Sequence, residues 1–133
     1  MTWINKPNDF TNEVLKTFDK KTKNVLGFGL QKIVVGSAVD SGAFRGNTRV
    51  SVDSADNGFD ETIVDKGGAS TIAKGGAVIA SVKSSAGHVF YFQNNAPYGY
   101  RLEMGWSPQP TSHNLFALTA QAMKNKFDAE FGR

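Results

Sequence analysis

The sequence predicts an α+β fold: a long N-terminal helix, a small antiparallel sheet packed by helices, and a C-terminal amphipathic helix. Three observations predict it. Apolar residues recur at helical spacing in the first quarter of the chain, two short stretches have strand composition, and a second helical stripe closes the sequence. With 133 residues the chain can bury a core without disulfides, and it contains no Cys. We therefore expect a single domain over residues 1–133.

The first expected element is a long helix. Residues 7–9, Pro-Asn-Asp, supply its start, because a short polar side chain accepts hydrogen bonds from the free amides of the first turn. Gly27 and Gly29 each weaken a helix by about 1 kcal/mol relative to Ala, so the pattern allows a bend or a break there. The turn at residues 40–42 ends the segment. The apolar stripe consists of Phe10, Val14, Phe18, Val25, Leu26, Leu30, Ile33 and Val34.

The middle of the chain is expected to hold a strand, a loop and a helix. Residues 47–53 alternate valine with polar residues, and this period of two indicates a half-buried strand. Residues 54–68 are acidic and rich in turn formers, so we expect a long, mobile loop that orders on assembly. Residues 69–84 favour a helix, in which Gly75 and Gly76 would let another element approach closely.

The last third begins with the clearest strand. Residues 88–93, HVFYFQ, are β-branched or aromatic almost throughout and are bounded by turn formers. Strands separated by helices could pair in either direction, and a two-stranded sheet needs helices on one face and leaves an open edge. A short helix should end at Gly105, and residues 110–112 should open the last helix. The stripe of that helix is Leu115, Leu118, Ala122, Met123, Phe127 and Phe131.

Charge and composition exclude several classes of protein. The net charge is +3, and a nucleic-acid binder usually interleaves aromatics with a denser basic stripe. A basic DNA-binding module, which would bind with a steep salt dependence, is therefore a secondary alternative. The first ten residues lack the pattern of a signal peptide, and no apolar run approaches the roughly 20 residues of a membrane span. We expect a soluble protein without a membrane partner. His88 and His113 lie far from any carboxylate cluster, so no metal site is expected.

Asp40-Ser41-Gly42 is the stretch that most suggests catalysis, because aspartic proteases carry such a run in two copies whose acids share a proton. This chain has one copy, so the alternative function is a homodimeric aspartic-type peptidase that uses Asp40. The helical spacing before Asp40 favours an Asx-type turn instead, in which Asp40 accepts a backbone amide and Gly42 takes a positive φ. We therefore expect neither enzymatic activity nor a cofactor.

Two stretches of the chain resemble segments of the tail-completion (neck) proteins of tailed bacteriophages. Residues 37–47, SAVDSGAFRGN, are similar to the family's P-V-D-T-G-x-L-R-x-S segment, which follows a first helix. Residues 92–110, FQNNAPYGYRLEMGWSPQP, are similar to its N-N-x-P-Y-A-x-x-L-E-x-G-x-S-x-Q-A-P segment, which precedes a C-terminal helix. The matching positions are Val39, Asp40, Gly42, Arg45, Asn94, Asn95, Pro97, Tyr98, Leu102, Glu103, Gly105, Ser107, Gln109 and Pro110. Departures are Ala38, Phe44 and the T-S-H-N that follows Pro110.

The resemblance implies a small α+β protein that assembles as a ring, often a hexamer, in the virion neck. Its partners would be copies of itself, portal-adaptor proteins, and tail-tube or tail-terminator proteins, with DNA at most passing through the lumen. Assembly would take place in the host cytoplasm. No cofactor is implied, and the role is structural: the ring joins tail to head.

In that setting, large rigid side chains and arginine near the second segment are candidates for subunit contacts. We predict an interface at Tyr100, Arg101, Glu103 and Trp106, whereas Tyr98 and Leu102 are predicted to pack in the core. Structural turns are predicted at Asp40, Gly42, Asn94, Asn95 and Gly105, with Pro97 starting the short helix.

Overall fold

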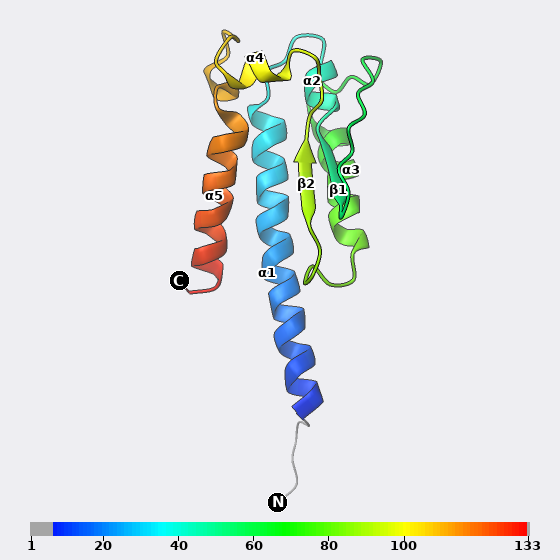
Figure 1. The fold of residues 1–133 in the computed structure, drawn as a ribbon, viewed down its shortest axis with the longest axis vertical. Coiled ribbons are helices and arrows are strands. Elements are labelled where there is room, and N and C mark those ends of the chain that lie inside the picture. Colours follow the sequence, from blue (N-terminus) through cyan, green and yellow to red (C-terminus); the bar gives the residue numbers. More distant parts are fainter. Residues whose placement is uncertain (1–6, 133) are drawn as a thin grey trace, which may run out of the picture.

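The computed structural model describes residues 7–132, and Figure 1 shows its helices and strands. Their bounds are α1 Pro7–Gly36, α2 Ala43–Gly46, β1 Arg49–Val52, α3 Ala69–Ser81, β2 Phe90–Gln93, α4 Gly99–Glu103, a 3₁₀ turn at Pro110–Ser112, and α5 Leu115–Glu130. The long first helix, the two-stranded antiparallel sheet against helices and the C-terminal helix confirm the predicted α+β fold.

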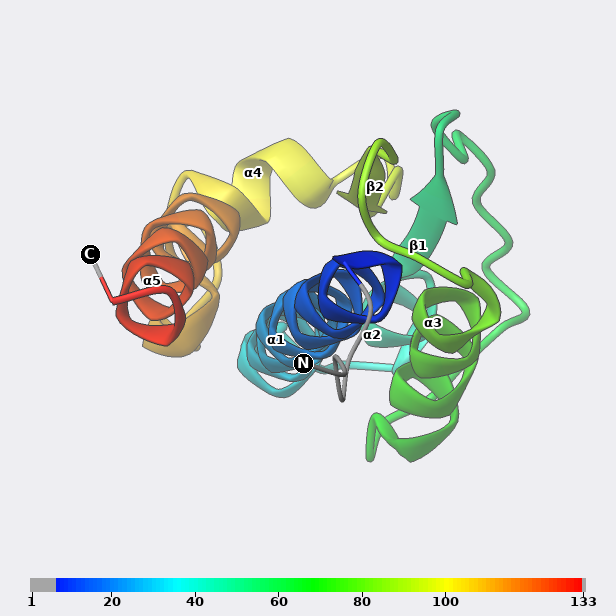
Figure 2. The same ribbon diagram turned by 90° about the horizontal axis from the view of Figure 1, so that it is seen from below.

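α1 is the central helix of the fold. It lies between α5 on one side and α3 with the sheet on the other, and its first turns extend beyond the rest of the fold (Figures 1 and 2). The helix runs unbroken through Gly27 and Gly29, so the bend or break that the sequence allowed does not occur. A Cβ at Gly29 would lie 2.2 Å from the Sδ of Met123, well inside van der Waals contact. Gly29 therefore lets α5 pack close against α1.

The predicted apolar stripe of α1 forms core only in the C-terminal half of the helix. Leu30 and Val34 are 1% and 0% exposed. Val14 is 51% exposed, which corrects its place in the stripe, because the first turns of α1 extend past the neighbouring elements. Phe18 contacts Phe131 with ring centroids 5.5 Å apart. The side chain of Phe10 lies outside the part of the chain that the structure describes.

β1 and β2 form an antiparallel pair in which Val50 faces Phe92. Each strand covers four residues and is shorter than the period-two patterns suggested, since the flanking residues turn away into loops. α3 packs on this pair and on α1. A Cβ at its Gly75 would lie 2.6 Å from the Cδ2 of Leu30, so α1 approaches closely at this glycine as expected. A Cβ at Gly76 would meet nothing within 4 Å, so the close approach predicted there is wrong. The core is Leu30, Val34, Val50 and Ile79, with Leu26, Ile72, Val78 and Phe92 packed against it.

α5 differs from the predicted C-terminal helix at its start and in one residue of its stripe. It begins at Leu115 rather than at Pro110, because Pro110–Ser112 forms a separate 3₁₀ turn and Asn114 takes a left-handed φ of 53°. Leu115 is buried as predicted, whereas Leu118 is 64% exposed. A helix that packs on a single neighbour buries a narrow stripe, and Leu118 lies outside it.

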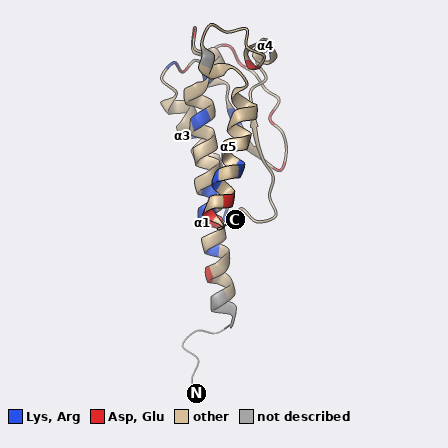
Figure 3. Cartoon of the chain, turned by 90° about the vertical axis from the view of Figure 1, so that its left-hand side faces the viewer, with Lys and Arg blue, Asp and Glu red and all other residues tan. Residues whose placement is uncertain are grey.

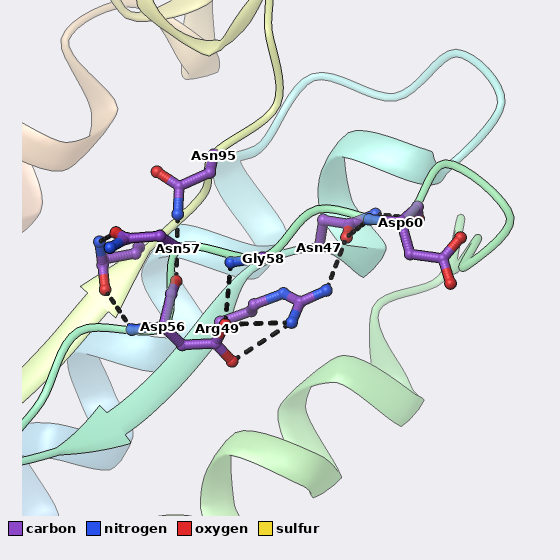
Figure 4. A network of polar contacts seen from close by, with 8 residues as sticks. Asn47, Arg49, Asp56, Asn57, Gly58, Asp60 and Asn95 are labelled. Carbon is purple, nitrogen blue, oxygen red and sulfur yellow. Dashed lines mark hydrogen bonds and ion pairs between the residues drawn. The ribbon is translucent and has the colours of Figure 1, made fainter.

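Residues 54–68 form neither helix nor strand, as predicted, and polar side chains tie them to the body of the fold (Figure 4). The Oδ1 of Asn47 accepts the backbone N–H of Asp60 at 2.9 Å, and its Nδ2 donates to the carbonyl of the same residue at 2.8 Å. The Arg49 guanidinium pairs with the Asp56 carboxylate at 3.2 Å. The mobility of this loop and its ordering on assembly stay predictions, which hydrogen exchange tests.

Candidate functional site

The two stretches that carry the family resemblance meet in space. Residues 37–47 and 92–110 lie together around α2 and α4, at the top of Figure 1. The Gln109 side chain binds both backbone groups of Val39: its Nε2 donates to the carbonyl at 2.9 Å, and its Oε1 accepts the N–H at 3.1 Å. We call the surface formed by residues 38–44 and 98–109 the apical surface.

The turn at Asp40 has the predicted shape but another side chain supports it. Gly42 has a φ of 94°, as predicted, and a Cβ there would lie 2.9 Å from the backbone N of Lys66. The Oγ of Ser41, not the predicted carboxylate of Asp40, accepts the backbone N–H of Ala43 at 3.2 Å. Asp40 is exposed in a turn between α1 and α2. That setting differs from the strand-flanked acid of an aspartic protease.

Arg45 anchors this turn, a role that the sequence did not reveal. Its guanidinium donates to three backbone carbonyls: Val35 at 3.0 Å, Ser37 at 2.9 Å and Lys66 at 2.7 Å. The first two belong to the end of α1 and the residue after it, and the third belongs to the 54–68 loop. Because arginine offers five donors in a rigid fork, one side chain can hold these segments together.

The predicted asparagine turn is present without a left-handed residue at either asparagine. The Oδ1 of Asn94 accepts the N–H of Ala96 at 3.2 Å, so this residue bonds its own backbone as expected. Its Nδ2 also donates to the carbonyl of Phe44, which joins the two resembling segments. Asn95 instead donates to the carbonyl of Asp56 at 3.0 Å. Among the described non-glycine residues, positive φ occurs at Asp53 and Asn114.

α4 begins two residues after Pro97 and ends in a Schellman motif. Gly105 has a φ of 95°, as predicted for a helix-ending glycine. The N–H of Trp106 donates to the carbonyl of Arg101 at 3.0 Å, and the N–H of Gly105 donates to that of Leu102 at 3.2 Å. This pair of bonds fixes the direction in which the chain leaves the helix, and so fixes the place of Trp106.

The predicted interface residues divide into two groups. Tyr100 and Trp106 are 76% and 71% exposed, and the Arg101 guanidinium lies 5.2 Å from the Trp106 ring. Glu103 has an intramolecular role: its carboxylate accepts the N–H groups of Phe116 and Ala117 at 2.9 and 3.1 Å. These are first-turn amides of α5, where a carboxylate is favoured by unpaired donors and the helix dipole. Glu103 thus holds α4 against α5, and its predicted subunit contact stays untested.

A hollow of about 730 Å³ opens in the apical surface between the two resembling segments. Phe44 and Tyr98 line it, with ring centroids 5.9 Å apart. Tyr98 is 39% exposed, so it is not the fully buried core residue predicted. Burial, followed by the nearby charges of Asp40 and Glu61, raises the pKa of its phenol above the usual value. The remaining lining is Ala38, Val39, Asp40, Ser41, Gly42, Leu102, Trp106, Ser107, Pro108 and Gln109.

Apolar side chains and backbone make up most of the lining of the hollow, and the carboxylate of Asp40 is exposed beside them. The side chains of Ser41, Ser107 and Gln109 are hydrogen-bonded to nearby backbone groups. An apolar lining with a few polar groups is typical of binding pockets. Within residues 7–132, no group of three His, Cys, Asp or Glu side chains could hold a metal ion. None of the helices in that range combines the length and the apolar content that a bilayer crossing requires. Comparison with models of known families, with curated proteins and with solved structures gives no match.

Proposed function

We propose that this chain is a structural protein of the neck of a tailed bacteriophage, a tail-completion or connector ring subunit that joins tail to head. The observation that carries the proposal is the meeting of the two resembling segments at one surface. Several hydrogen bonds within and between the two segments are made by residues at matching positions: Gln109 with Val39, and Arg45 with the carbonyl of Ser37. Asn94, also at a matching position, bonds the carbonyl of Phe44, where the sequence departs from the family. The resembling residues thus belong to one physical unit.

The apical surface would act by binding a neighbouring protein of the neck. Trp106, Tyr100 and Arg101 belong to the residue types that dominate interface energetics. The two aromatic rings bury a large area at low entropic cost, and the arginine offers several hydrogen-bond donors. The Schellman motif and the Glu103 bonds hold them on a rigid support, which lowers the cost of ordering on binding. The proposed partners are portal-adaptor and tail-tube or tail-terminator proteins, and DNA at most passes through the lumen.

The alternative, a homodimeric aspartic-type peptidase, has less support. It rests on the run Asp40-Ser41-Gly42 alone. In the fold that run joins two helices, while the aspartic-protease mechanism needs two acids held close together by flanking strands. Peptide cleavage at acid pH that is lost in Asp40→Asn would favour this alternative.

The test uses the virus that encodes the chain. Particles made without the protein are expected to accumulate unjoined heads and tails in electron micrographs, and complementation with the unaltered chain restores joining. The double variant Tyr100→Ala/Trp106→Ala should fold normally but lower the titre of infectious particles at least about tenfold, since loss of a hot spot costs more than 1.4 kcal/mol. Val89→Ala, at a residue 56% exposed away from the apical surface, is the matched control. Normal infectious particles in the absence of the protein would overturn the proposal.

A further inference from the structure

Within residues 7–132, two surfaces with exposed apolar side chains lie on opposite sides of the molecule. One belongs to the 54–68 loop, which carries four acidic residues and one basic residue and exposes 56% of Val64. The other is a groove between α1 and α5. Figures 1 and 2 both place the loop on the far side of the fold from α5. This arrangement lets each surface face a different neighbour.

The groove is apolar with a basic border. It encloses about 540 Å³, with Phe28 and Leu115 among its lining residues. Val35 of α1 and Leu118 of α5 line it as well and are 57% and 64% exposed. The lining includes Lys32 and no described Asp or Glu. Figure 3 shows basic residues along the two helices, with acidic residues among them toward the lower end.

Two ammonium groups gather at this border. The Nζ atoms of Lys32 and Lys126 each lie 5.3 Å from the centre of the Phe28 ring. Lys126 also lies 3.5 Å from the carboxylate of Glu130, whereas Lys32 forms no ion pair within residues 7–132. The Lys32 ammonium therefore places a positive charge at the border of the groove, and an opposite charge brought near it is attracted.

The backbone of the 54–68 loop holds the exposed side chain of Val64 close to acidic residues, whose charge is opposite to that of the groove border. The N–H of Asp65 donates to the carbonyl of Gly42 at 2.9 Å, and the N–H of Ile63 donates to that of Asp60 at 3.1 Å. These bonds hold the backbone on both sides of Val64. Glu61, three residues before it, is exposed. An exposed valine with a nearby carboxylate matches an apolar groove with a lysine border.

We propose that the 54–68 loop of one copy docks in the α1–α5 groove of the next copy. Val64 enters between Val35 and Leu118, and the Glu61 carboxylate lies near Lys32 and Lys126. The two surfaces differ, so the contact is heterologous and repeats head to tail. Such contacts form a ring where the rotation between copies closes and an open filament where it does not, and the proposed ring subunit requires the first. The inference rests on the proposed function as a ring subunit and names the contact that would build the ring.

The absence of Cys from the sequence makes disulfide trapping a direct test. Val64→Cys and Leu118→Cys are made separately in the full chain and mixed under mild oxidation. The mixture should give a cross-linked dimer of one variant with the other, while the double variant Val64→Cys/Leu118→Cys should give a ladder of oligomers that ends at the closed ring. Val89→Cys mixed with Leu118→Cys is the matched control, because Val89 and Val64 are both 56% exposed, and it should stay uncross-linked.

Charge exchange supplies an independent readout. Glu61→Lys should weaken self-association at least about tenfold in sedimentation equilibrium, and Glu61→Lys combined with Lys32→Glu should recover part of that loss. Cross-linking of Val64→Cys with itself would indicate a two-fold contact and overturn the proposal. So would a chain that stays monomeric and uncross-linked at about 1 mM, the limit of weak association.

The outcome is separable from that for the proposed function. A ring in assembled particles without the Val64–Leu118 cross-link would refute this contact and leave the neck role intact. If the cross-link forms but heads and tails join without the protein, the contact is supported and the proposed neck role is refuted.

Discussion

The 54–68 loop and the α1–α5 helix pair are held in place by different kinds of interaction. Asn47, Arg49 and Asp65 fix the loop through hydrogen bonds that need defined donors and acceptors. The helix pair is held largely by apolar contact, as where Met123 packs in the space that a Cβ at Gly29 would occupy. Polar anchoring depends on the identity of single atoms, whereas apolar packing depends on volume and shape. The two regions should therefore respond to different changes.

The largest effect is expected at the loop. Asn47 is 1% exposed. In Asn47→Ala, the N–H and the carbonyl of Asp60 lose their hydrogen bonds to the Asn47 side chain. The substitution removes three side-chain hydrogen bonds of 2.9 Å or less, two with Asp60 and one with the carbonyl of Ala43. Each contributes a net of about 1 kcal/mol, so the free energy of unfolding should fall by about 3 kcal/mol in urea denaturation.

Asn57→Ala is the control for that change. Asn57 is exposed, and its Oδ1 accepts a hydrogen bond from the Nε2 of Gln93 at 3.1 Å. Its replacement should change stability by no more than about 0.5 kcal/mol. If the two variants were equally destabilised, burial of the Asn47 amide would not be what anchors the loop.

The second effect is expected in the helix pair. Gly29→Val places new atoms where Met123 packs, and overpacking of this kind costs about 1–3 kcal/mol. Gly27→Val is the control, since a Cβ there meets nothing within 4 Å, and thermal unfolding should show little loss. In a Met123→Ala background the cost of Gly29→Val should shrink, because the clash is gone. An unchanged cost would contradict the close fit of α5 on α1 at this glycine.

The same contrast explains what could be predicted from the sequence. Helical periodicity identified α1 and α5 because packing leaves a repeating apolar pattern along the chain. Glycine identified the turn at residue 42 and the end of α4 because positive φ limits the choice of residue. The bonds of Arg45 to the end of α1, of Asn47 to the loop and of Glu103 to α5 join positions distant along the chain and leave no period. No spacing in a single sequence reveals such pairs.

The exposed face of α5 shows a second limit. The sequence placed Leu118 in the buried stripe because its spacing fits, but periodicity marks a face without saying what covers it. The prediction that Val14 belongs to the buried stripe of α1 is wrong for the same reason. Both residues are apolar and exposed, at 64% and 51%, and Leu118 lines the groove proposed to receive another copy.

The smallest expected effect on stability is at Asp65, and its dependence on pH distinguishes the 54–68 loop from the α1–α5 helix pair. The Asp65 carboxylate accepts the N–H and the hydroxyl of Thr71, each at 2.8 Å, and the N–H of Gly68 at 2.9 Å. The Thr71 backbone hydrogen bond is the main cause that lowers the pKa of Asp65 below its usual value. Because the folded pKa lies below the unfolded one, this stabilisation is present above about pH 4 and is lost as the pH falls through the folded pKa.

Asp65→Ala should therefore lower stability by about 1 kcal/mol at pH 7, as loss of a helix-capping side chain does. The difference from the unaltered protein should begin to narrow below about pH 4, where the Asp65 carboxyl of the unfolded chain becomes protonated, and should close as the pH falls through the lower folded pKa. Gly29→Val should lose the same stability at both pH values, because no titrating group takes part in that contact. Urea denaturation of the three proteins at pH 7 and pH 3 measures the comparison. A gap for Asp65→Ala that stays constant across this range would show that its ionised carboxylate does not hold the loop to α3.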